Sequence, residues 1–508
     1  MSDRDNALVL TGGGLTPAAV TAVARRGRKV EIDPGALARM AEARAVVERH
    51  LDEGQPVYGL STGLGANVTH ALPREALEEF SRLTLRGRSN SVGPPLPAEA
   101  VRATMTVRLN NLLTGASGAS PAIAENFADL LNAGLHPVMP SIGSIGASDL
   151  CLMAHLGLAL IGEGEIDADG EKLPAQEALA RAGLKPAELG PKDGLVICNS
   201  SSVSVGLGAL ALHDANDAYD LANIAAALSL EGFRGNLTPF DPRVAPVRPQ
   251  PGQAEAAGDL LGLFAGGSLL EPGAARRLQD PISLRCTAQV HGALKACLDF
   301  AGPALDADLN GESTNPVVLL GDGEILSTGN FHAPLLAIAL DTLARALTQV
   351  AILSASRTAR LLMAQLSGLP AYLSPRGPGR SGFAPLLKTA EALMAEIEHV
   401  ATPVRGGLCL AIGGVEDHMT HAPQAAQKLT ELLWRFRLVI AIELLVAAQA
   451  VDLRGIDRLG RGTARAQAAV RDIVPPLDDD RPLGADVERI AAELLATGRL
   501  LEIVHKTS

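Results

Sequence analysis

The sequence predicts a mainly α-helical protein, with an N-terminal mixed helical domain over residues 1–205 and a long-helix bundle over residues 206–508. Composition is the first reason, because 47% of the 508 residues are hydrophobic and only 3% are aromatic. That mix, rich in Ala and Leu, favours long and closely packed helices. The second reason is that long amphipathic patterns dominate the chain from residue 206 onward.

The first domain is expected to alternate short helices with loops. Asp33 and Pro34 open a helix that runs to about residue 52, with the aspartate as N-cap and the proline at the first helical position. A glycine-rich loop over residues 59–67 follows, and its glycines suit a mobile lid. Another helix is predicted near residues 98–112.

The second domain is expected to consist of long helices joined by loops. The amphipathic patterns lie near residues 206–230, 285–302, 333–367, 384–400 and 422–452. Two stretches rich in Pro and Gly break them: residues 239–252 are predicted to be a surface excursion, and residues 373–382 a loop near a subunit contact. The most apolar run, residues 203–230, is interrupted by His and Asp residues, so a buried helix explains it better than a membrane span.

Charge, cysteine content and the N-terminal residues indicate which partners the protein binds and where in the cell it acts. The formal net charge of -12 argues against nucleic acid or an anionic membrane as the main partner. The five cysteines are scattered and odd in number, which is typical of reduced thiols. The N-terminal residues are polar and show no signal-peptide pattern, so we expect a cytoplasmic protein.

The stretch GSIGASDLCLMAH, residues 143–155, places an Ala-Ser pair on a glycine-rich turn before an apolar helix. Such a turn can make an electrophile from the chain itself. The backbone nitrogen of Asp149 attacks the carbonyl of Ala147, two water molecules leave, and Ser148 becomes a methylene group on the new ring. The ring supplies chemistry that no standard side chain has. The plain alternative is a strand-to-helix turn with Asp149 as N-cap.

Other segments follow in a fixed order. They are YGLSTGLG with Tyr58, DGLVICNSSSVSVG with Asn199, LQDPISLRC with Arg285, STNPVVL from Ser313, GNFHA from Gly329 and VEDH from Val415. In this order and spacing they resemble the histidine/phenylalanine/tyrosine ammonia-lyase family, whose members carry a methylidene-imidazolone (MIO) ring made from Ala-Ser-Gly. The resemblance runs from LTGGGLT near the N-terminus to at least residue 450.

The resemblance implies an ammonia-lyase-like fold and a homotetramer whose active sites each draw on three chains. It also implies an amino acid substrate and no external cofactor. His418 and His421 lie close together without a third ligand at metal spacing, so no metal site is expected. The literal tripeptide Ala116-Ser117-Gly118 matches an ordinary helix-flanking segment of the family and is not assigned the ring.

Removing ammonia from an amino acid needs a grip on the carboxylate, a base for a carbon-bound proton, and activation of the amine. Arg285 suits the first task, because a guanidinium matches a carboxylate as a two-pronged fork; an ion pair with Asp280 is the alternative. Tyr58 is the candidate base, because its loop matches the family's catalytic loop. A buried tyrosine with a satisfied hydroxyl is the alternative for Tyr58.

The family resemblance adds further residues that contact substrate. Asn199 matches an asparagine that touches the ring, and Asn330 with Phe331 matches a segment that lines the site. Glu416 and Gln279 match pocket positions. The plain alternatives are a turn residue for Asn199, helix entry and core packing for Asn330 and Phe331, and an exposed helical charge for Glu416.

The sequence departs from the family at three points. The family usually reads GASGDL where this chain reads GASDL, so either the glycine is deleted or Asp149 serves as the third ring residue. A Cβ at residue 149 hinders ring closure, which needs an unhindered nitrogen and a tightly bent backbone. Ile282 replaces a tyrosine that assists at the electrophile, and Gly87-Arg88 stands where the family reads the substrate's side chain.

Arg88 bears on the substrate. A partly desolvated arginine needs an anionic partner, which is either a protein carboxylate such as Glu416 or an acidic group on the substrate. The second possibility predicts a polar or acidic side chain, not plain phenylalanine, tyrosine or histidine.

Three hypotheses for the function follow. The leading one is an MIO-type lyase that eliminates ammonia from an α-amino acid to give an α,β-unsaturated acid. The alternatives are an aminomutase of the same family, which returns the ammonia to the β-carbon, and a non-catalytic member in which no ring forms.

Overall fold

The computed structural model describes residues 7–65, 68–404 and 414–506. Two loop residues of the predicted lid, Ala66 and Asn67, lie outside these ranges, as does Cys409. The chain forms two compact units. The first comprises Met1–His213, Ala301–Leu340 and Pro403–Gln427, and the second Asp214–Phe300, Asp341–Thr402 and Lys428–Ser508.

This division differs from the single boundary that the sequence predicts at residue 205. Two later segments return to the first unit. Helical periodicity reports which face of a helix is buried, and it carries no information about the unit in which that face is buried.

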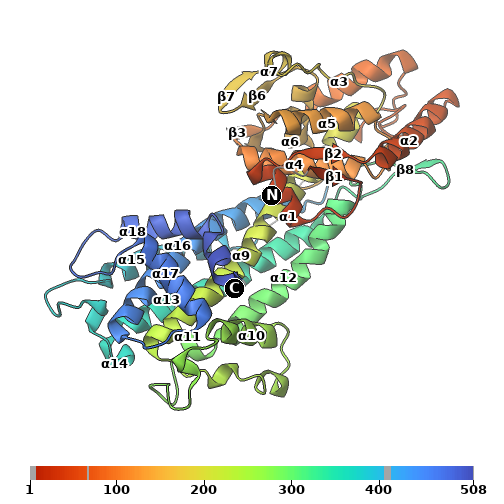
Figure 1. Ribbon diagram of the computed structural model, residues 1–508. Coiled ribbons are helices and arrows are strands. Elements are labelled where there is room, and N and C mark those ends of the chain that lie inside the picture. Colours follow the sequence, from red (N-terminus) through yellow and green to blue (C-terminus); the bar gives the residue numbers. More distant parts are fainter. Residues whose placement is uncertain (1–6, 66–67, 405–413, 507–508) are drawn as a thin grey trace. The chain divides into compact units, whose positions relative to one another are not determined.

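One helix of the first unit, which packs against α1 (Pro17–Arg26) and α5 (Pro121–Ala133), is buried almost along its whole length (Figure 1). This helix, α4, spans Ala98–Leu112. Its buried polar residues are hydrogen-bonded: Thr104 Oγ1 donates to the carbonyl of Ala100 in the same helix, and Arg102 donates to the carbonyls of Val23 and Leu131 in other helices. The other helices named here are α2 Pro34–Asp52, α3 Leu77–Arg88, α6 Leu150–Leu160, α7 Ala175–Arg181 and α8 Asp193–Cys198.

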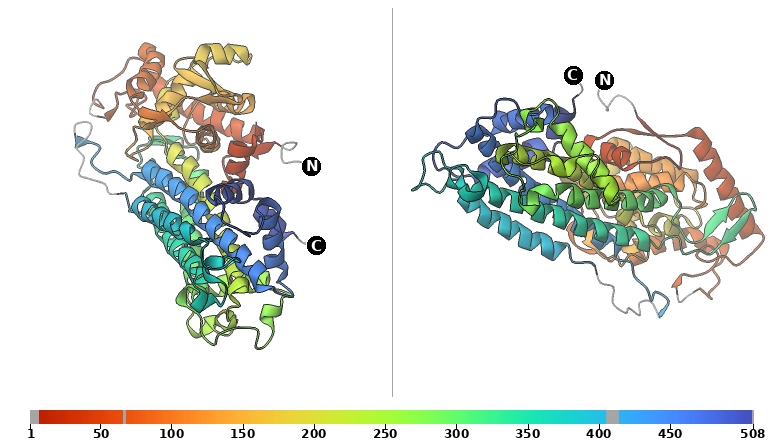
Figure 2. Two further views of the ribbon diagram at one scale, coloured as in Figure 1. Left: turned by 90° about the vertical axis from the view of Figure 1, so that its left-hand side faces the viewer. Right: turned by 90° about the horizontal axis from the view of Figure 1, so that it is seen from below.

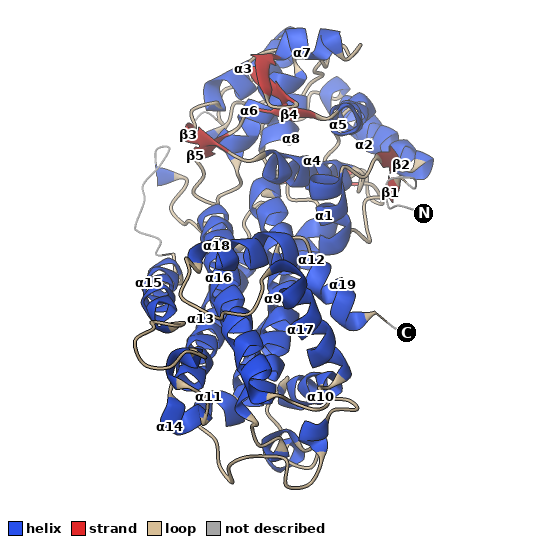
Figure 3. Ribbon diagram, turned by 60° about the vertical axis from the view of Figure 1, so that its left-hand side comes forward, coloured by secondary structure: helices blue, strands red, loops and turns tan. Residues whose placement is uncertain are grey.

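Short strands join these helices (Figure 3). Strand β1 (Leu8–Leu10) pairs in parallel with β2 (Val30–Ile32), and β3 (Val92–Pro95) pairs antiparallel with β5 (Pro140–Ile142). An antiparallel sheet contains β4 (Leu135–Pro137), β6 (Glu165–Ala168) and β7 (Glu171–Pro174), and β8 (Val317–Leu319) forms a hairpin with β9 (Glu324–Leu326). With three or four residues each, these strands are too short to leave an alternating pattern in the sequence.

Long helices that run side by side build the second unit (Figures 1 and 2). They include parts of α9 (Ser202–Phe233), α12 (Thr287–Asn310), α13 (Pro334–Leu362) and α16 (Ala422–Arg454), together with α15 (Ala384–Val400). Shorter helices complete it: α10 Gln253–Leu263, α11 Ile282–Arg285, α14 Ala364–Ser367, α17 Arg461–Ile473, α18 Gly484–Arg489 and α19 Arg499–His505. Single turns of 3₁₀-helix span Arg74–Ala76, Thr238–Phe240, Ala245–Val247, Ser268–Leu270 and Ala371–Leu373, and a π-helix spans Ile490–Leu495.

Two helices, Asp193–Phe233 and Pro334–Leu362, are long and apolar enough to cross a membrane by length and composition alone. Their most apolar windows are 100% and 56% buried inside the protein, respectively. Packing in the core explains the apolar character of the first, as the sequence predicts.

A buried ion pair connects α13 to α16 inside the second unit. Arg357 donates to both carboxylate oxygens of Glu443 at 2.5 and 2.9 Å, and both side chains are fully buried. Ser229 of α9 donates a further hydrogen bond of 2.7 Å to the same carboxylate. Three helices therefore meet at one buried charge.

Removing one partner of this pair leaves the other charged and buried. We expect Arg357→Met to lower the free energy of unfolding by about 3–5 kcal/mol, measured by chemical denaturation. The double variant Arg357→Met/Glu443→Leu should recover most of that loss, because both charges are then gone. A double variant no more stable than the single one would show that the pair is not the source of the loss.

Candidate active site

A cavity of about 900 Å³ lies in the first unit, where segments far apart in the sequence converge. Most of the residues that the sequence singled out line it, namely Tyr58, Arg88, Ala147, Asn199, Phe331 and Glu416. The other lining residues are Leu64, Gly65, Val68, Gly87, Asn90, Leu150, Cys151, Leu195, Asn315, Ser327, Gly329, His332, Val415, Asp417 and His418.

The remaining predicted residues lie elsewhere. Ser148 and Asp149 are 3% and 0% exposed and do not reach the cavity surface. Asn330 is exposed, and its backbone N–H donates to Thr328 Oγ1, so it caps a turn and does not line the cavity. Gln279 and Arg285 belong to the second unit and are not among the residues that line this cavity.

Tyr58 is positioned by the turn that follows α2. Gly59 has a φ of +65°, and a Cβ there would collide with the side chains of Leu64 and Leu195, so only glycine allows the close approach. The backbone N–H of Gly65 donates a hydrogen bond of 3.1 Å to the Tyr58 hydroxyl oxygen. A donor aimed at this oxygen stabilises negative charge on it, which is what a phenol acting as a base requires.

The turn of residues 143–149 is fixed from two sides. Gly146 has a φ of +77°, and a Cβ there would meet Thr420 and the backbone nitrogen of His421. Thr420 Oγ1 donates to the Gly146 carbonyl at 2.8 Å, and the His421 N–H donates to the Ile145 carbonyl at 3.0 Å. On the other side, the Ser148 N–H donates to the Phe331 carbonyl at 3.1 Å. This double attachment presents Ala147 to the cavity.

Asp149 anchors this turn to the start of α9. The residue occupies the N-cap position of α6, as the plain alternative predicts, but its carboxylate does not cap that helix. It accepts hydrogen bonds from the Ser204 N–H at 2.8 Å and from Ser144 Oγ at 2.8 Å. Burial raises the pKa of Asp149, and the hydrogen bonds from Ser204 and Ser144 oppose that rise.

The residues present do not fit the ring predicted from Ala147, Ser148 and Asp149. Ring closure needs the Asp149 nitrogen free to bond to the Ala147 carbonyl carbon. That nitrogen donates a 2.7 Å hydrogen bond to the Ser200 carbonyl, and the side chain of the same residue is held at α9. Of the two readings of the short motif, deletion of the glycine fits, because Asp149 is the helix-start residue and not a ring residue.

Arg88 and Glu416 both line the cavity and are half-buried. Arg88 has no ion pair within the described residues, where its guanidinium donates only a long 3.5 Å hydrogen bond to the Thr84 carbonyl. Burial raises the pKa of Glu416, and the positive charge of Arg88 acts in the opposite direction. The two charges therefore influence each other without forming the ion pair that the sequence left as an alternative.

This coupling predicts a change in pH dependence. Because the charge of Arg88 lowers the pKa of Glu416, Arg88→Leu raises that pKa further, and Glu416 loses its charge at a higher pH on acidification. We expect the acid limb of kcat/KM against pH to move to higher pH in Arg88→Leu and to stay in place in Arg86→Leu. Arg86 is the matched control, because it lies on the same helix, is exposed and pairs with Glu163 at 2.7 Å. An unmoved limb in Arg88→Leu contradicts this coupling.

The cavity also contains polar residues that sequence reasoning did not assign to it. His332 Nε2 and His418 Nδ1 lie 2.7 Å apart and share a hydrogen bond, and burial, with the charge of His418, lowers the pKa of His332. Asn315 is another such residue: its carbonyl accepts a 3.1 Å hydrogen bond from Nδ2 of Asn199, which the sequence did predict, and this bond holds the Asn199 amide at the wall. His332 and His418 stand in the GNFHA and VEDH motifs, so their motifs were found but their pairing was not.

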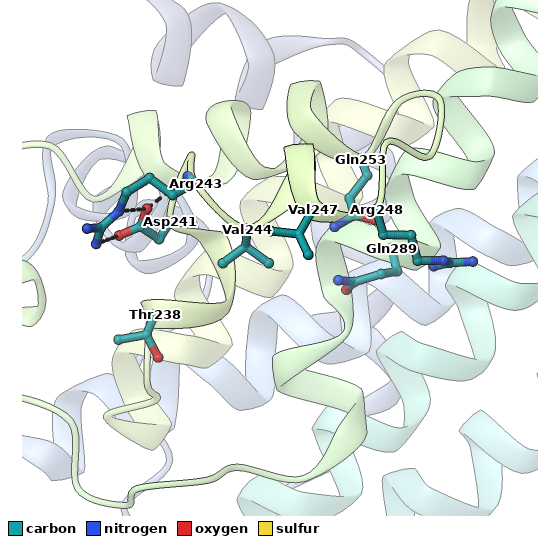
Figure 4. A pocket seen from close by; sticks show the side chains of 8 residues that line it. All are labelled: Thr238, Asp241, Arg243, Val244, Val247, Arg248, Gln253 and Gln289. Atoms are coloured by element: carbon teal, nitrogen blue, oxygen red, sulfur yellow. Dashed lines mark hydrogen bonds and ion pairs between the residues drawn. The ribbon is translucent and has the colours of Figure 1, made fainter.

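Within the described residues, no group of three or more His, Cys, Asp or Glu could hold a metal ion. Another hollow, of about 620 Å³, lies in the second unit (Figure 4). Its charged lining residues are Asp241, Arg243 and Arg248, of which the first two pair with each other at 2.6 Å, and its wall holds no tyrosine, histidine or cysteine. It lacks a candidate base of the kind that Tyr58 provides.

Comparison with known proteins agrees with the predicted fold and family. The family described as aromatic amino acid lyase matches residues 15–472. A histidine ammonia-lyase of Treponema denticola is 37% identical over 99% of both chains. Two solved structures are also similar to this chain, each with a TM-score of 0.92.

The ergothioneine-degrading enzyme ergothionase from Treponema denticola, in complex with desmethyl-ergothioneine sulfonic acid, is 34% identical and matches over 98% of this chain and 100% of that one. The tyrosine aminomutase of Streptomyces globisporus is 32% identical over 98% of both chains.

The family match spans most of the chain, and the relatives match it from end to end. The resemblance drawn from short motifs is thereby confirmed, as is the mainly α-helical, ammonia-lyase-like fold. The chain belongs to the aromatic amino acid lyase family.

Proposed function

We propose that the protein is a carbon–nitrogen lyase that eliminates the amine from an α-amino acid and leaves an α,β-unsaturated acid. One observation carries the proposal: a tyrosine with a donor on its hydroxyl oxygen lines the same cavity as Asn199, Phe331 and Glu416. Membership of the aromatic amino acid lyase family supports this reaction. So does the similarity to histidine ammonia-lyases.

Five side chains divide the work of proton removal and substrate binding in this reaction. Tyr58 takes a proton from the β-carbon, and the electron pair of that bond becomes the new double bond as the C–N bond breaks. Arg285 holds the substrate carboxylate by two parallel hydrogen bonds. Asn199 and Phe331 position the substrate in the cavity, and Glu416, which lines the same cavity, is assigned to its amine end.

The ring predicted at residues 147–149 is not part of this mechanism, because the turn does not fit it. Were it to form, an MIO ring would supply an electrophile that activates the amine. The residues that would hold it are those of the 143–149 turn.

Assembly completes the site in this proposal. Arg285 and Gln279 lie in the second unit, and Arg285 has no ion pair within the described residues, while its Nε is buried without a hydrogen-bond partner. Asp280, its alternative partner, instead accepts a 2.6 Å hydrogen bond from the Asn236 N–H. We infer that Arg285 and Gln279 act in a cavity of another copy of the chain, within a cytoplasmic homotetramer.

Arg88 is proposed to select the substrate's side chain. Its guanidinium faces the cavity without a carboxylate partner, which suits a polar or acidic side chain. One related structure holds a sulfonic acid ligand, desmethyl-ergothioneine sulfonic acid.

Arg88→Leu is therefore expected to lower kcat/KM by about tenfold to a hundredfold for amino acids with anionic side chains. The same change should leave kcat/KM for uncharged ones within a few-fold. Arg86→Leu again serves as control. Wild-type activity on phenylalanine that Arg88→Leu leaves intact, with no activity on any acidic side chain, contradicts this role.

A product screen tests the function itself. The full-length protein is incubated with a panel of aromatic, acidic and heteroaromatic α-amino acids, and the products are separated by liquid chromatography and weighed by mass spectrometry. Release of an α,β-unsaturated acid with an amine supports the lyase. A β-amino acid product would instead identify an aminomutase. The tyrosine aminomutase of Streptomyces globisporus, which is similar in structure to this chain, makes that alternative worth testing. Binding without any product is the result that the non-catalytic alternative predicts.

A further inference from the structure

We propose that Ser148 stays an unmodified serine and that the protein eliminates an amine that is already a permanent cation, a quaternary ammonium group. The proposal rests on the lyase function above and names its substrate class.

The turn meets one requirement for ring closure and fails the other. Ser148 has a φ of +54°, a tight bend that brings neighbouring peptide groups together, and its hydroxyl is buried without a partner. The attacking nitrogen, however, belongs to Asp149 and is committed to the Ser200 carbonyl at 2.7 Å. Closing the ring would remove this N–H and leave a buried carbonyl without its donor.

The side chain of Asp149 opposes any rearrangement of that nitrogen. Its carboxylate bonds to both the N–H and the hydroxyl of Ser204, on the first turn of α9, and to the hydroxyl of Ser144. The residue is 0% exposed, so no water replaces these partners when the backbone moves. Residue 149 thus works as a structural link between two helices, and no residue is left over for the third ring position.

Without an electrophile, the leaving amine must carry its own activation. A primary ammonium group has N–H protons that a base removes more readily than a C–H proton, and the neutral amine that results is a poor leaving group. A quaternary nitrogen has no N–H, so it keeps its positive charge until the C–N bond breaks.

The elimination step balances with groups that the protein and the substrate supply. The Tyr58 phenolate takes the β-proton, and the C–H electron pair forms the Cα=Cβ bond. The C–N electron pair leaves with nitrogen as a neutral tertiary amine. One negative charge on the base and one positive charge on the substrate become two neutral groups, and no oxidant or further reactant is needed.

The cavity has the side chains that recognise such a cation. Quaternary ammonium groups bind to the faces of aromatic rings, and a carboxylate adds direct charge attraction. Tyr58 and Phe331 supply rings to the cavity wall, and Glu416 supplies a carboxylate that has no ion pair among the described residues. Arg88 remains for an anionic group elsewhere on the substrate.

Peptide mass spectrometry of the purified full-length protein tests whether Ser148 stays an unmodified serine. The peptide that contains residues 147–149 is expected at its unmodified mass. Insertion of a glycine between Ser148 and Asp149 restores the family's motif and serves as the positive control, expected to lose two water molecules from this peptide. A two-water loss in the wild-type peptide, or in the peptide with Ala116-Ser117-Gly118, overturns the proposal while leaving the lyase function standing.

Matched pairs of substrates test whether the leaving amine is a quaternary ammonium group. L-Histidine and its Nα-trimethyl betaine give the same unsaturated acid, as do L-phenylalanine and its betaine, so one absorbance assay serves each pair. We expect kcat/KM for the betaine to exceed that for the primary amine by about a hundredfold or more in at least one pair. Equal rates, a preference for the primary amine, or turnover of neither pair by a protein that releases ammonia from another amino acid overturns the leaving-group assignment. No unsaturated acid from any of these compounds, or from any amino acid of the product screen, overturns the proposed function as well, while the peptide mass still decides whether the ring forms.

Discussion

Replacing Tyr58 by phenylalanine is expected to lower kcat by about a hundredfold or more, because the change removes the proton acceptor and keeps the ring's packing. The Gly65 N–H, which donates to the hydroxyl oxygen at 3.1 Å, loses this acceptor in the variant. KM should change little, since the phenyl ring still fills its place in the cavity wall. The measurement is steady-state kinetics with the best substrate of the product screen.

Tyr372→Phe is the matched control for this variant. Tyr372 is 46% exposed, belongs to the second unit and is not among the residues that line the cavity, so loss of its hydroxyl should leave kcat unchanged. A Tyr58→Phe enzyme that retains turnover within a few-fold of wild type would show that another group removes the proton. The paired histidines His332 and His418 would then be the next candidates.

Arg285→Leu is expected to lower kcat/KM by about a hundredfold to a thousandfold, because two charge-assisted hydrogen bonds to the substrate carboxylate are lost. Arg285→Lys should recover only part of that loss, since an ammonium group is a point charge and does not match the carboxylate as a fork. Arg243→Leu is the control, because Arg243 is exposed and pairs with Asp241. An Arg285→Leu enzyme with wild-type kcat/KM would contradict the proposal that Arg285 binds the substrate carboxylate.

The same variants test whether the site is shared between chains. If Tyr58 and Arg285 of one site come from different copies, mixed oligomers of Tyr58→Phe and Arg285→Leu chains regain activity at about a quarter of their sites. Co-expression of the two inactive chains, followed by light scattering and kinetics, makes the measurement. Mixed oligomers with no activity, or a fully active monomer, would show that each chain completes its own site.

Sequence patterns located the long helices well, because a buried face repeats every three or four residues over many turns. The helix predicted at 98–112 is α4, and those predicted at 384–400 and 422–452 are α15 and α16 to within two residues. Asp33 caps α2 as expected, with its side chain accepting from the Ala36 N–H. The helix predicted at 333–367 ends at Leu362, because Met363 adopts an extended conformation before the short α14.

The candidate site was found in the sequence only through motifs, since its members are brought together by contacts over long separations. Asp149 shows the limit most clearly. Its partners Ser200 and Ser204 lie some fifty residues away, and only their positions reveal that the residue links α6 to α9. The pairing of His332 with His418 is equally invisible in the sequence. A motif gives the residue type, whereas the fold decides which atoms are free to react.

Quantifying both products of one reaction tests the central claim most directly. The full-length protein is incubated with its best substrate, and the unsaturated acid is measured by absorbance while the released amine is measured by chromatography over the same time course. An elimination at this cavity predicts one amine for each unsaturated acid in the wild type and in Tyr372→Phe, and almost none of either in Tyr58→Phe. Equal product formation in Tyr58→Phe, or amine release without unsaturated acid, would contradict it.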